Sequence, residues 1–510
     1  MKTHQFEPTW LWYLIISLWL LHHQPICQAD VSLPPIFGSH MVLQHGREIP
    51  IAGSASPGEK IKLVLGDETK NIIAEKDGRW STAFSPRKPS FQPVNLTIEG
   101  KNKIILDNVV FGDVWLCSGQ SNMQWTLKDS IGGPELARSQ NLSKLRLLHL
   151  RGRPQTQGRE FTGAELEKCN PRDYLSGSWE MASSDSALEF SGVAIFFGHE
   201  IMQSQNIPIG LVQNAVGGTP IESWLPQDSI KQNPKLRPLL ENDWYFNEMV
   251  HSFCRDRAAL NLKKLSPELQ LIRPLATHPY HPGFMFESGI SPLQQMQIKG
   301  VIWYQGESNA HDPALYRIMF PMLIQGWRQF FHQPEMPFLF VQLPNFSNTT
   351  NWPELREIQR DSLSISSTGM AVTIDLGDPS DVHPRNKAPV GHRLALLARA
   401  MVYGESIESA GPMIQSALLK NNTIHIQFTH VKNGLKTSDG QSAAGFEIAG
   451  NDGTFRHVKA EIINNAILIS TDNLNDVSIV RYGWSQNPSC NLVNQERLPA
   501  SPFQIRVQTK

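Results

Sequence analysis

The stretch GDVWLCSGQSNM, residues Gly112–Met123, decides how this chain is expected to fold. The apolar run Val114–Cys117 predicts a buried strand, Gly119 predicts a turn, and Ser121 stands where a helix would begin. In α/β proteins the chemistry gathers at the carboxyl ends of the sheet strands, and a helix amino terminus offers N–H groups to a developing oxyanion. The stretch therefore makes Ser121 a candidate nucleophile.

Two features of the same stretch argue against relying on it alone. Met123 stands where the G-x-S-x-G nucleophile elbow has its second glycine, so that motif is absent here. Serine is also a preferred helix N-cap, which by itself is the simpler explanation of Ser121. A catalytic role therefore requires partner residues elsewhere in the chain.

Downstream of this stretch, apolar runs alternate with longer helical patterns, which is typical of a βαβ succession. Further buried parallel strands are predicted at residues 145–150, 209–213, 300–304, 338–342 and 370–374. A helix is predicted to begin at Pro389 and to end before Gly404, because apolar residues recur between them at helical spacing. The sequence thus predicts an α/β catalytic domain over residues 111–404.

Short alternating stretches separated by turn residues flank this domain. Strands predicted at residues 61–65, 71–74 and 94–99 indicate a β-sandwich-like module over residues 30–110. Strands predicted at residues 423–428, 445–448 and 466–470, with a hairpin turn at 451–453, indicate a second β-rich module over residues 405–510. Residues 227–294 fit neither pattern and are expected to form active-site walls.

The amino terminus, residues 1–29, predicts a secretory signal peptide. Lys2 precedes a mostly apolar run over residues 10–21, which is shorter than the roughly 20 residues needed to span a bilayer. Cys27 and Ala29 supply small residues before a cleavage site at Asp30. The expected location is secreted or periplasmic, or lysosomal in an animal host; an uncleaved anchor is the alternative.

The composition is that of a globular protein without a charge bias. Hydrophobic residues make up 40% of the chain and the formal net charge is −1, so neither nucleic acid nor an anionic membrane is an expected partner. The five cysteines form no C-x-x-C pair, so no metal site is expected. Four of them follow the predicted cleavage site and can supply a disulfide in an oxidising compartment. The oligomeric state is left open.

A base and a carboxylate occur together in the stretch DPSDVHP, residues 378–384. A serine nucleophile needs a base, and the base needs an orienting acid. Pro384 favours extended geometry before it, in which Asp381 and His383 project to the same side. Asp381 would then support one imidazole nitrogen while the other faces the serine. Asp378 is the second candidate for the acid, and an Asx-type turn with a surface histidine is the alternative interpretation.

Two further loops follow apolar strands and carry glycine with polar side chains. They are VGGTPIESW, residues 216–224, and WYQGESN, residues 303–309. Glycine lets backbone N–H groups approach a ligand closely, and Gln305 or Asn309 could donate a side-chain amide to an oxyanion. Each loop alone is explained as a plain turn, but four such segments in one domain predict a site.

The motifs GQSNM, GGTPIESW, WYQGESN and DVHP, in this order and spacing, resemble the sialate O-acetylesterase family of the wider SGNH hydrolases. The resemblance covers residues 112–404 and extends more loosely to the flanking β regions. It implies an α/β, SGNH-hydrolase-like (flavodoxin-like) domain with a parallel sheet in three layers. It further implies a carboxylic ester hydrolase that needs no cofactor and removes O-acetyl groups from sugars, above all 9-O-acetylated sialic acids.

Carried over by position, the resemblance implies Ser121 as nucleophile and His383 as general base. The Ser121 amide, a glycine of the Gly217–Gly218 pair and the Gln305 region would form the oxyanion hole. Gly218 is taken as the glycine donor. The superfamily's asparagine donor is not plainly matched, because Gln305 and Asn309 compete for that place.

The acid and one further carboxylate fit the family pattern less closely. Many SGNH relatives place the acid three residues before the histidine, where this chain has Ser380, so Asp381 departs from that pattern. Glu307 either orients a neighbour or binds substrate.

The substrate has two candidate classes. An anionic sialic acid calls for a basic group, and Arg385 and Lys387 follow the histidine motif, although a charged helix start also accounts for them. The rival substrate is acetylated xylan or another plant polysaccharide, and the rival class is a noncatalytic carbohydrate-binding protein on the same fold. Tryptophans near the motifs suit sugar rings or the core equally well: Trp125, Trp224 and Trp303.

Overall fold

The computed structural model describes residues 30–139, 142–241, 244–262, 277–347, 351–471 and 476–509. The predicted signal peptide, residues 1–29, lies outside them. The chain divides into two compact units, the first made of the residues up to Pro34 with Pro50–Phe84 and Asn95–Leu106, and the second of the remainder. Among the described residues, no helix combines the length and the apolar character that crossing a membrane requires.

The first unit is built from antiparallel strands. Its strands are β3 (Lys60–Leu65), β4 (Glu68–Ile73) and β5 (Arg79–Phe84), with β2 (Ile49–Ser54) from Pro50 onward and β6 (Ser90–Glu99) from Asn95 onward. Strand β3 pairs with β4 and β6, and β2 pairs with β5. In β3 the buried Ile61 and Leu63 alternate with the exposed Lys60 and Lys62. This period of two is the pattern of a sheet with one buried face. The strands predicted at 61–65 and 94–99 are confirmed, whereas the one predicted at 71–74 begins earlier, at Glu68.

The second unit contains a mixed sheet with the order β11-β8-β12-β7-β13-β14-β15. The strands are β7 (Lys103–Gly119), β8 (Leu145–His149), β11 (Trp179–Met181), β12 (Ile209–Ala215), β13 (Gly300–Tyr304), β14 (Phe338–Val341) and β15 (Thr368–Ala371). The strand predicted at 300–304 has these bounds, and the other predicted strands are present with shifted ends. All neighbours on this path are parallel except β11, which runs antiparallel to β8, so the predicted parallel sheet carries one additional antiparallel edge strand that the sequence did not predict.

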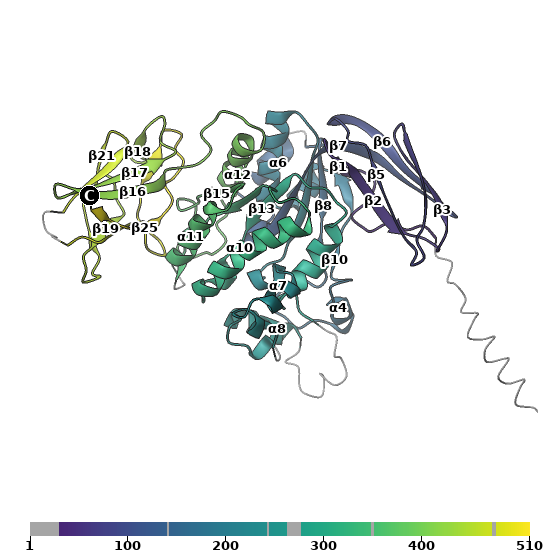
Figure 1. Cartoon of the computed structure of the whole chain (residues 1–510), viewed down its shortest axis with the longest axis horizontal. Coiled ribbons are helices and arrows are strands. Elements are labelled where there is room, and N and C mark those ends of the chain that lie inside the picture. The colour runs from purple at the N-terminus through teal and green to yellow at the C-terminus, as the bar shows by residue number, and fades with distance from the viewer. Residues whose placement is uncertain are drawn as a thin grey trace, which may run out of the picture. The chain divides into compact units, whose positions relative to one another are not determined.

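Helices cover both faces of this sheet (Figure 1). Trp115 of β7 stands opposite Gly300, and Trp303 of β13 stands opposite Ser118, so the two indoles leave the sheet on opposite faces. Trp115 meets Phe197 of α6 (Gly192–Gln205) at 5.0 Å between ring centroids. Trp303 meets a tryptophan of α10 (Pro313–Phe330) at 5.5 Å. The architecture is therefore α/β.

Two further helices complete the layers. Helix α12 (Ala388–Met401) packs against α6 and against β14 and β15, and α11 (Trp352–Asp361) packs against α10. Helix α12 begins one residue before the predicted Pro389, and its buried Val390 and Leu394 face the sheet side of the helix. The predicted helix is confirmed.

Strand β7 is the point at which the order of the sheet reverses. The chain runs from β7 to β8 and β12 on one side, and then crosses to β13 on the other. Such a reversal leaves a crevice beyond the carboxyl end of the first strand. Gly119, the last residue of β7, has φ +139°, and a Cβ there would stand 2.1 Å from the Tyr304 carbonyl oxygen. Only glycine permits this close approach of two strand ends.

Shorter elements connect the main ones. They are β1 (Val42–Gln44), α3 (Gly133–Ser139), β9 (Arg151–Gly152), α4 (Gly163–Lys168), β10 (Leu175–Ser176), α5 (Ser184–Leu188), α7 (Gln227–Gln232), α8 (Ser252–Asn261), β18 (Leu435–Thr437) and β24 (Leu492–Asn494). Helices α7 and α8 lie in the stretch 227–294, to which the sequence assigned no element. The segment between β12 and β13 is therefore partly helical.

The carboxyl-terminal part of the second unit carries two sheets whose strands are antiparallel, except that β26 runs parallel to β16 at the edge of the first. One has the order β21-β22-β17-β16-β26 and the other β20-β19-β23-β25. Their strands are β16 (Met413–Lys420), β17 (Thr423–Thr429), β19 (Phe446–Ala449), β20 (Arg456–His457), β21 (Glu461–Ile463), β22 (Ala466–Ser470), β23 (Ile479–Tyr482), β25 (Phe503–Arg506) and β26 (Gln508–Thr509). The strands predicted at 423–428, 445–448 and 466–470 are confirmed.

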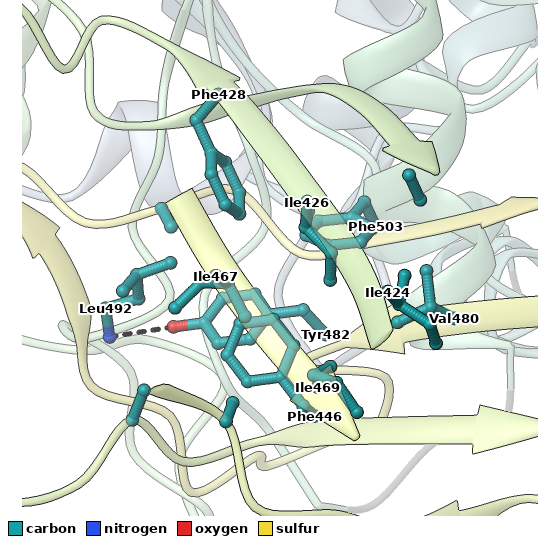
Figure 2. Packing of buried hydrophobic residues seen from close by; sticks show 14 of the residues in the cluster. Ile424, Ile426, Phe428, Phe446, Ile467, Ile469, Val480, Tyr482, Leu492 and Phe503 are labelled. Carbon is teal, nitrogen blue, oxygen red and sulfur yellow. Dashed lines mark hydrogen bonds between the residues drawn. The ribbon is translucent and has the colours of Figure 1, made fainter. Parts of the chain in front are cut away.

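Figure 2 shows the hydrophobic cluster that these strands share. Ile426 and Phe428 of β17 and Phe446 of β19 meet Tyr482 and Phe503 there. The Tyr482 ring lies 4.8 Å from Phe446, and its hydroxyl oxygen accepts a hydrogen bond of 2.9 Å from the Leu492 N–H. A buried tyrosine whose hydroxyl is satisfied costs the core little, because its polar end is not left without a partner.

Candidate active site

A pocket of about 610 Å³ opens beyond the carboxyl ends of β7 and β12. Ser121 and His383 both line it, together with Gly217 and Gly218 of the loop after β12. Three of the four sequence motifs thus meet in one place. The fourth, WYQGESN, contributes Glu307 and the following serine to the lining.

Ser121 is the first residue of the short helix α2 (Ser121–Gln124), which follows β7 directly. Gln120 is the N-cap residue and makes no side-chain capping bond, so the serine is not the cap. The Ser121 Oγ instead lies 2.8 Å from Nε2 of His383, which is 262 residues away in the sequence. A serine hydroxyl hydrogen-bonded to an imidazole nitrogen is the arrangement that activates a nucleophile.

The His383 ring is held in a half-buried position. Trp125 stacks on it with 5.4 Å between the ring centroids and 19° between the planes. Burial lowers the pKa of His383 below its ordinary value, the positive charge of Lys387 lowers it further, and Asp381 acts in the opposite direction. The neutral imidazole, which can accept a proton, is thus favoured.

Asp381 contacts His383 mainly through the backbone. Its Oδ1 accepts a hydrogen bond of 2.8 Å from the His383 N–H, and it lies 3.7 Å from Nδ1 of the ring. The second distance suits an ion pair but exceeds a hydrogen bond. Asp378 accepts hydrogen bonds from the N–H and Oγ of Ser380 and from the Asp381 N–H. The segment thus forms an Asx turn rather than an extended strand, and this turn presents the histidine to the pocket.

Asn122 joins the helix that carries the serine to the segment that carries the histidine. Its Nδ2 donates to the Val382 carbonyl oxygen at 2.9 Å and to Glu307 Oε1 at 2.5 Å. Its Oδ1 accepts a hydrogen bond of 2.5 Å from Nζ of Lys387. Glu307 thus orients Asn122 through Oε1, and it also lines the pocket.

Neither basic residue that the sequence offered for a substrate carboxylate is in the pocket lining. Lys387 is fully buried, and burial lowers its pKa to about 7. Arg385 donates through Nε to the Asp129 carbonyl oxygen at 3.0 Å. Both long side chains turn toward protein groups, so the expectation that one of them meets substrate is not supported.

The Gly217–Gly218 loop lies against the serine. A Cβ on Gly217 would stand 3.5 Å from the Ser121 Cβ, and the Gly217 N–H donates to Gln124 Oε1 at 2.8 Å. Gly218 has φ +78°, and a Cβ there would meet Tyr280 Oη at 2.1 Å. Among the described residues, the N–H groups of Ser121 and Gly218 have no hydrogen-bond partner. These two donors are available to an oxyanion.

Gln305 and Asn309, the two side-chain amides considered as oxyanion donors, are buried and do not line the pocket. Gln305 Nε2 donates to Asn309 Oδ1 at 2.7 Å, and Asn309 Nδ2 donates to Glu222 Oε2 at 2.9 Å. Asn309 Oδ1 also accepts from the Ile221 N–H at 2.9 Å. The two side chains therefore stabilise the loop after β12 through Ile221 and Glu222. They are not placed where they could donate to a substrate.

The tryptophans near the motifs differ in their role. Trp125 stacks on His383, as described above. Trp224 and Trp303 are completely buried and meet each other edge to face at 5.7 Å. These two belong to the core and are not available to a sugar ring.

Part of the pocket wall comes from residues that the sequence did not single out. His251, Phe253 and Arg257 belong to α8 or precede it directly, and Tyr280 follows later in the chain. The sequence predicted active-site walls in this region, which contains clusters of histidine and aromatic residues. No sequence pattern identified Arg257 as a pocket residue.

No cysteine is among the described residues that line the pocket. In the described part of the chain, Cys117, Cys169, Cys254 and Cys490 are free thiols. No cluster of histidine, cysteine and acidic residues among the described residues has a metal-binding arrangement.

Comparison with known proteins gives consistent results. Residues 283–401 match the family model "Carbohydrate esterase, sialic acid-specific acetylesterase". The chain is 31% identical to the sialate O-acetylesterase of Rattus norvegicus, over 92% of this chain and 93% of that protein, and 31% identical to that of Mus musculus, over 91% and 92%. A crystal structure of a carbohydrate acetylesterase from Xanthomonas citri matches with a TM-score of 0.76 and 31% identity, over 93% of this chain and 99% of that one.

Proposed function

We propose that this chain, which belongs to the sialate O-acetylesterase family, removes O-acetyl groups from carbohydrates with Ser121, His383 and Asp381. Family membership makes it a carboxylic ester hydrolase. The observation that carries the assignment of residues is the hydrogen bond of 2.8 Å between Ser121 Oγ and His383 Nε2, inside a pocket.

The proposed reaction is acyl transfer through an acetyl-enzyme. His383 Nε2 takes the proton of Ser121 as Oγ attacks the acetyl carbonyl carbon, and the carbonyl oxygen becomes an oxyanion. The sugar oxygen then leaves with the proton from the imidazolium. Water, activated by the same imidazole, hydrolyses the acetyl-serine, which releases acetate and restores the enzyme.

The oxyanion would be held by backbone donors. The N–H of Ser121 stands at a helix start, and the N–H of Gly218 belongs to a loop that only glycine can form, so both directions are fixed before substrate binds. Donors that need no reorganisation are the most effective ones, and loss of one costs about 10²- to 10³-fold in turnover.

Asp381 would act as the third member of the triad. Its carboxylate fixes the His383 backbone and, at 3.7 Å from Nδ1, lies close enough to stabilise the imidazolium that forms during attack. Because this carboxylate is half exposed, solvent screens part of the attraction. We therefore expect Asp381 to contribute less to stabilising the His383 imidazolium than a buried acid would.

The substrate that we propose is a 9-O-acetylated sialic acid, in keeping with the names of the curated relatives. The second candidate is an acetylated neutral polysaccharide such as xylan, for which the same catalytic parts would serve. The SGNH-type domain would span residues 111–404, between β-rich modules at 30–110 and 405–510. A signal peptide at residues 1–29 would direct the chain to the secretory pathway.

The direct test is Ser121→Ala, with p-nitrophenyl acetate and 9-O-acetyl-N-acetylneuraminic acid as substrates. We expect kcat/KM to fall by at least about 10³-fold for both, because the nucleophile is removed. Labelling by a fluorophosphonate probe should also be lost.

Ser118→Ala is the matched control, since Ser118 is a buried serine three residues earlier that does not line the pocket. It should retain activity and labelling. Wild-type activity in Ser121→Ala, with the protein folded by circular dichroism, would remove Ser121 from its role.

A further inference from the structure

We infer that Arg257 binds the carboxylate of an acidic sugar and so selects an anionic substrate, an inference that rests on the esterase function proposed above. Arg257 belongs to α8, a helix labelled in Figure 1. It lies in the segment between β12 and β13 and lines the same pocket as Ser121 and His383. It belongs to the pocket wall, whereas the two residues that would carry the chemistry come from other parts of the fold.

The arginine is fixed relative to the glycine loop. Its Nη1 donates to the Thr156 carbonyl oxygen at 2.7 Å, and the Thr156 hydroxyl donates to the Gly217 carbonyl oxygen at 2.9 Å. The Tyr280 hydroxyl donates to the same Gly217 oxygen at 2.8 Å. A group bound by Arg257 is thereby held in a defined position relative to the loop that lies against Ser121.

The guanidinium keeps binding capacity for a ligand. Of its nitrogens, only Nη1 donates to a described protein group, and no described carboxylate lies within 4.0 Å of any of them. The guanidinium carbon stands 5.0 Å from the centre of the Phe253 ring, whose face stabilises a cation. The guanidinium group of Arg257 is thus oriented, but no described carboxylate neutralises its charge. A substrate carboxylate can do so by accepting two parallel hydrogen bonds from it.

Arg257 is also the permanent positive charge of the described pocket lining. The other basic residues there are histidines, and burial lowers the pKa of both His251 and His383. Lys387 is buried beneath the site and bonded to Asn122. An uncharged acetylated polysaccharide would leave the guanidinium partly desolvated without an anionic partner, so this residue favours an acidic sugar over xylan.

The test compares three esters on the full chain: 9-O-acetyl-N-acetylneuraminic acid, its C1 carboxamide, and p-nitrophenyl acetate. We expect the wild type to prefer the free acid to the carboxamide by about 10- to 100-fold in kcat/KM, as a charge-assisted pair implies. Arg257→Gln should erase this preference by raising KM for the free acid, with kcat nearly unchanged and p-nitrophenyl acetate hydrolysis unaffected. Arg257→Lys, which keeps the charge and loses the fork, should fall between the two.

Arg255→Gln is the matched control. Arg255 belongs to the same helix, donates through Nε to the Val250 carbonyl oxygen and does not line the pocket. It carries the same change of charge and should retain the wild-type preference for the free acid. An equal loss in Arg255→Gln and Arg257→Gln would reduce the effect to general electrostatics and overturn the inference.

Other outcomes separate this inference from the proposed function. Equal hydrolysis of acid and carboxamide by the wild type, or a loss in Arg257→Gln that is the same for all three esters, would overturn the role of Arg257 while leaving the esterase intact. No hydrolysis of any ester would instead defeat the proposed function. A preference for an O-acetylated oligogalacturonide that is also lost in Arg257→Gln would support carboxylate recognition and assign it to a uronic acid.

Discussion

The floor and the wall of the pocket are built in different ways. The floor comes from the ends of β7 and β12 and the segment of His383, and buried hydrogen bonds connect it through Asn122. The wall comes from α8 and Tyr280, in the long segment between β12 and β13. Under the proposed function, residues on the floor would act on any acetyl ester, whereas residues on the wall would meet only the rest of the substrate. The reaction and the choice of substrate can therefore change independently.

The largest expected loss of activity that tests this distinction between floor and wall comes from His383→Asn. Removing the base should lower kcat/KM by about 10³-fold or more, because the serine hydroxyl is a weak nucleophile without it. The loss should be the same factor for p-nitrophenyl acetate and for an acetylated sugar, which steady-state kinetics on both esters would show. A loss confined to the sugar ester would place the histidine in substrate binding and break the distinction between floor and wall.

A smaller effect is expected from Asp381→Asn. With its carboxylate half exposed and 3.7 Å from Nδ1, the substitution should lower kcat by about 10²-fold, since it removes a charge that stabilises the imidazolium. Asp378→Asn, in the same turn, should cost less. If the Asp378 variant loses more activity than the Asp381 variant, Asp378 is the acid of the triad.

The smallest expected effect is a displacement of the pH profile by Lys387→Met. The positive charge of Lys387 helps to lower the pKa of His383, so its removal should raise that pKa. Because the neutral imidazole is the base, the acid limb of kcat/KM should move to higher pH, by less than about one unit. Activity at pH 8 should change little. A shift to lower pH would show that another group governs this limb.

Much of this floor is predictable from the sequence, because its parts follow apolar runs. A short apolar run between glycines, such as Val114–Cys117, favours a buried strand, and the polar residues after it then lie at the edge of the sheet. Ser121 and His383 could be paired because a serine nucleophile needs a base and because their two motifs resemble those of one esterase family. The turn at Asp378 could also be read from its Asx chemistry.

The remaining parts depend on contacts between distant residues, which no local pattern carries. Gln305 and Asn309 follow a strand and look available in the sequence, yet Gly306, with φ +151°, turns this loop so that both side chains are buried. The antiparallel edge strand β11 is only three residues long and leaves no period to detect. Arg257 is positioned by a hydrogen bond to the carbonyl oxygen of Thr156, which is 101 residues away. No pattern in the sequence around Arg257 indicates this partner.

The three hydrogen bonds of Asn122 also bear on how the enzyme comes into being during synthesis. The ribosome makes the serine 262 residues before its histidine, and the partners of Asn122 at Val382 and Lys387 emerge with that late segment. Until then the nascent polypeptide carries an inert alcohol. Under the proposed mechanism, acetyl turnover would therefore report a chain that has been made and folded at least as far as Lys387.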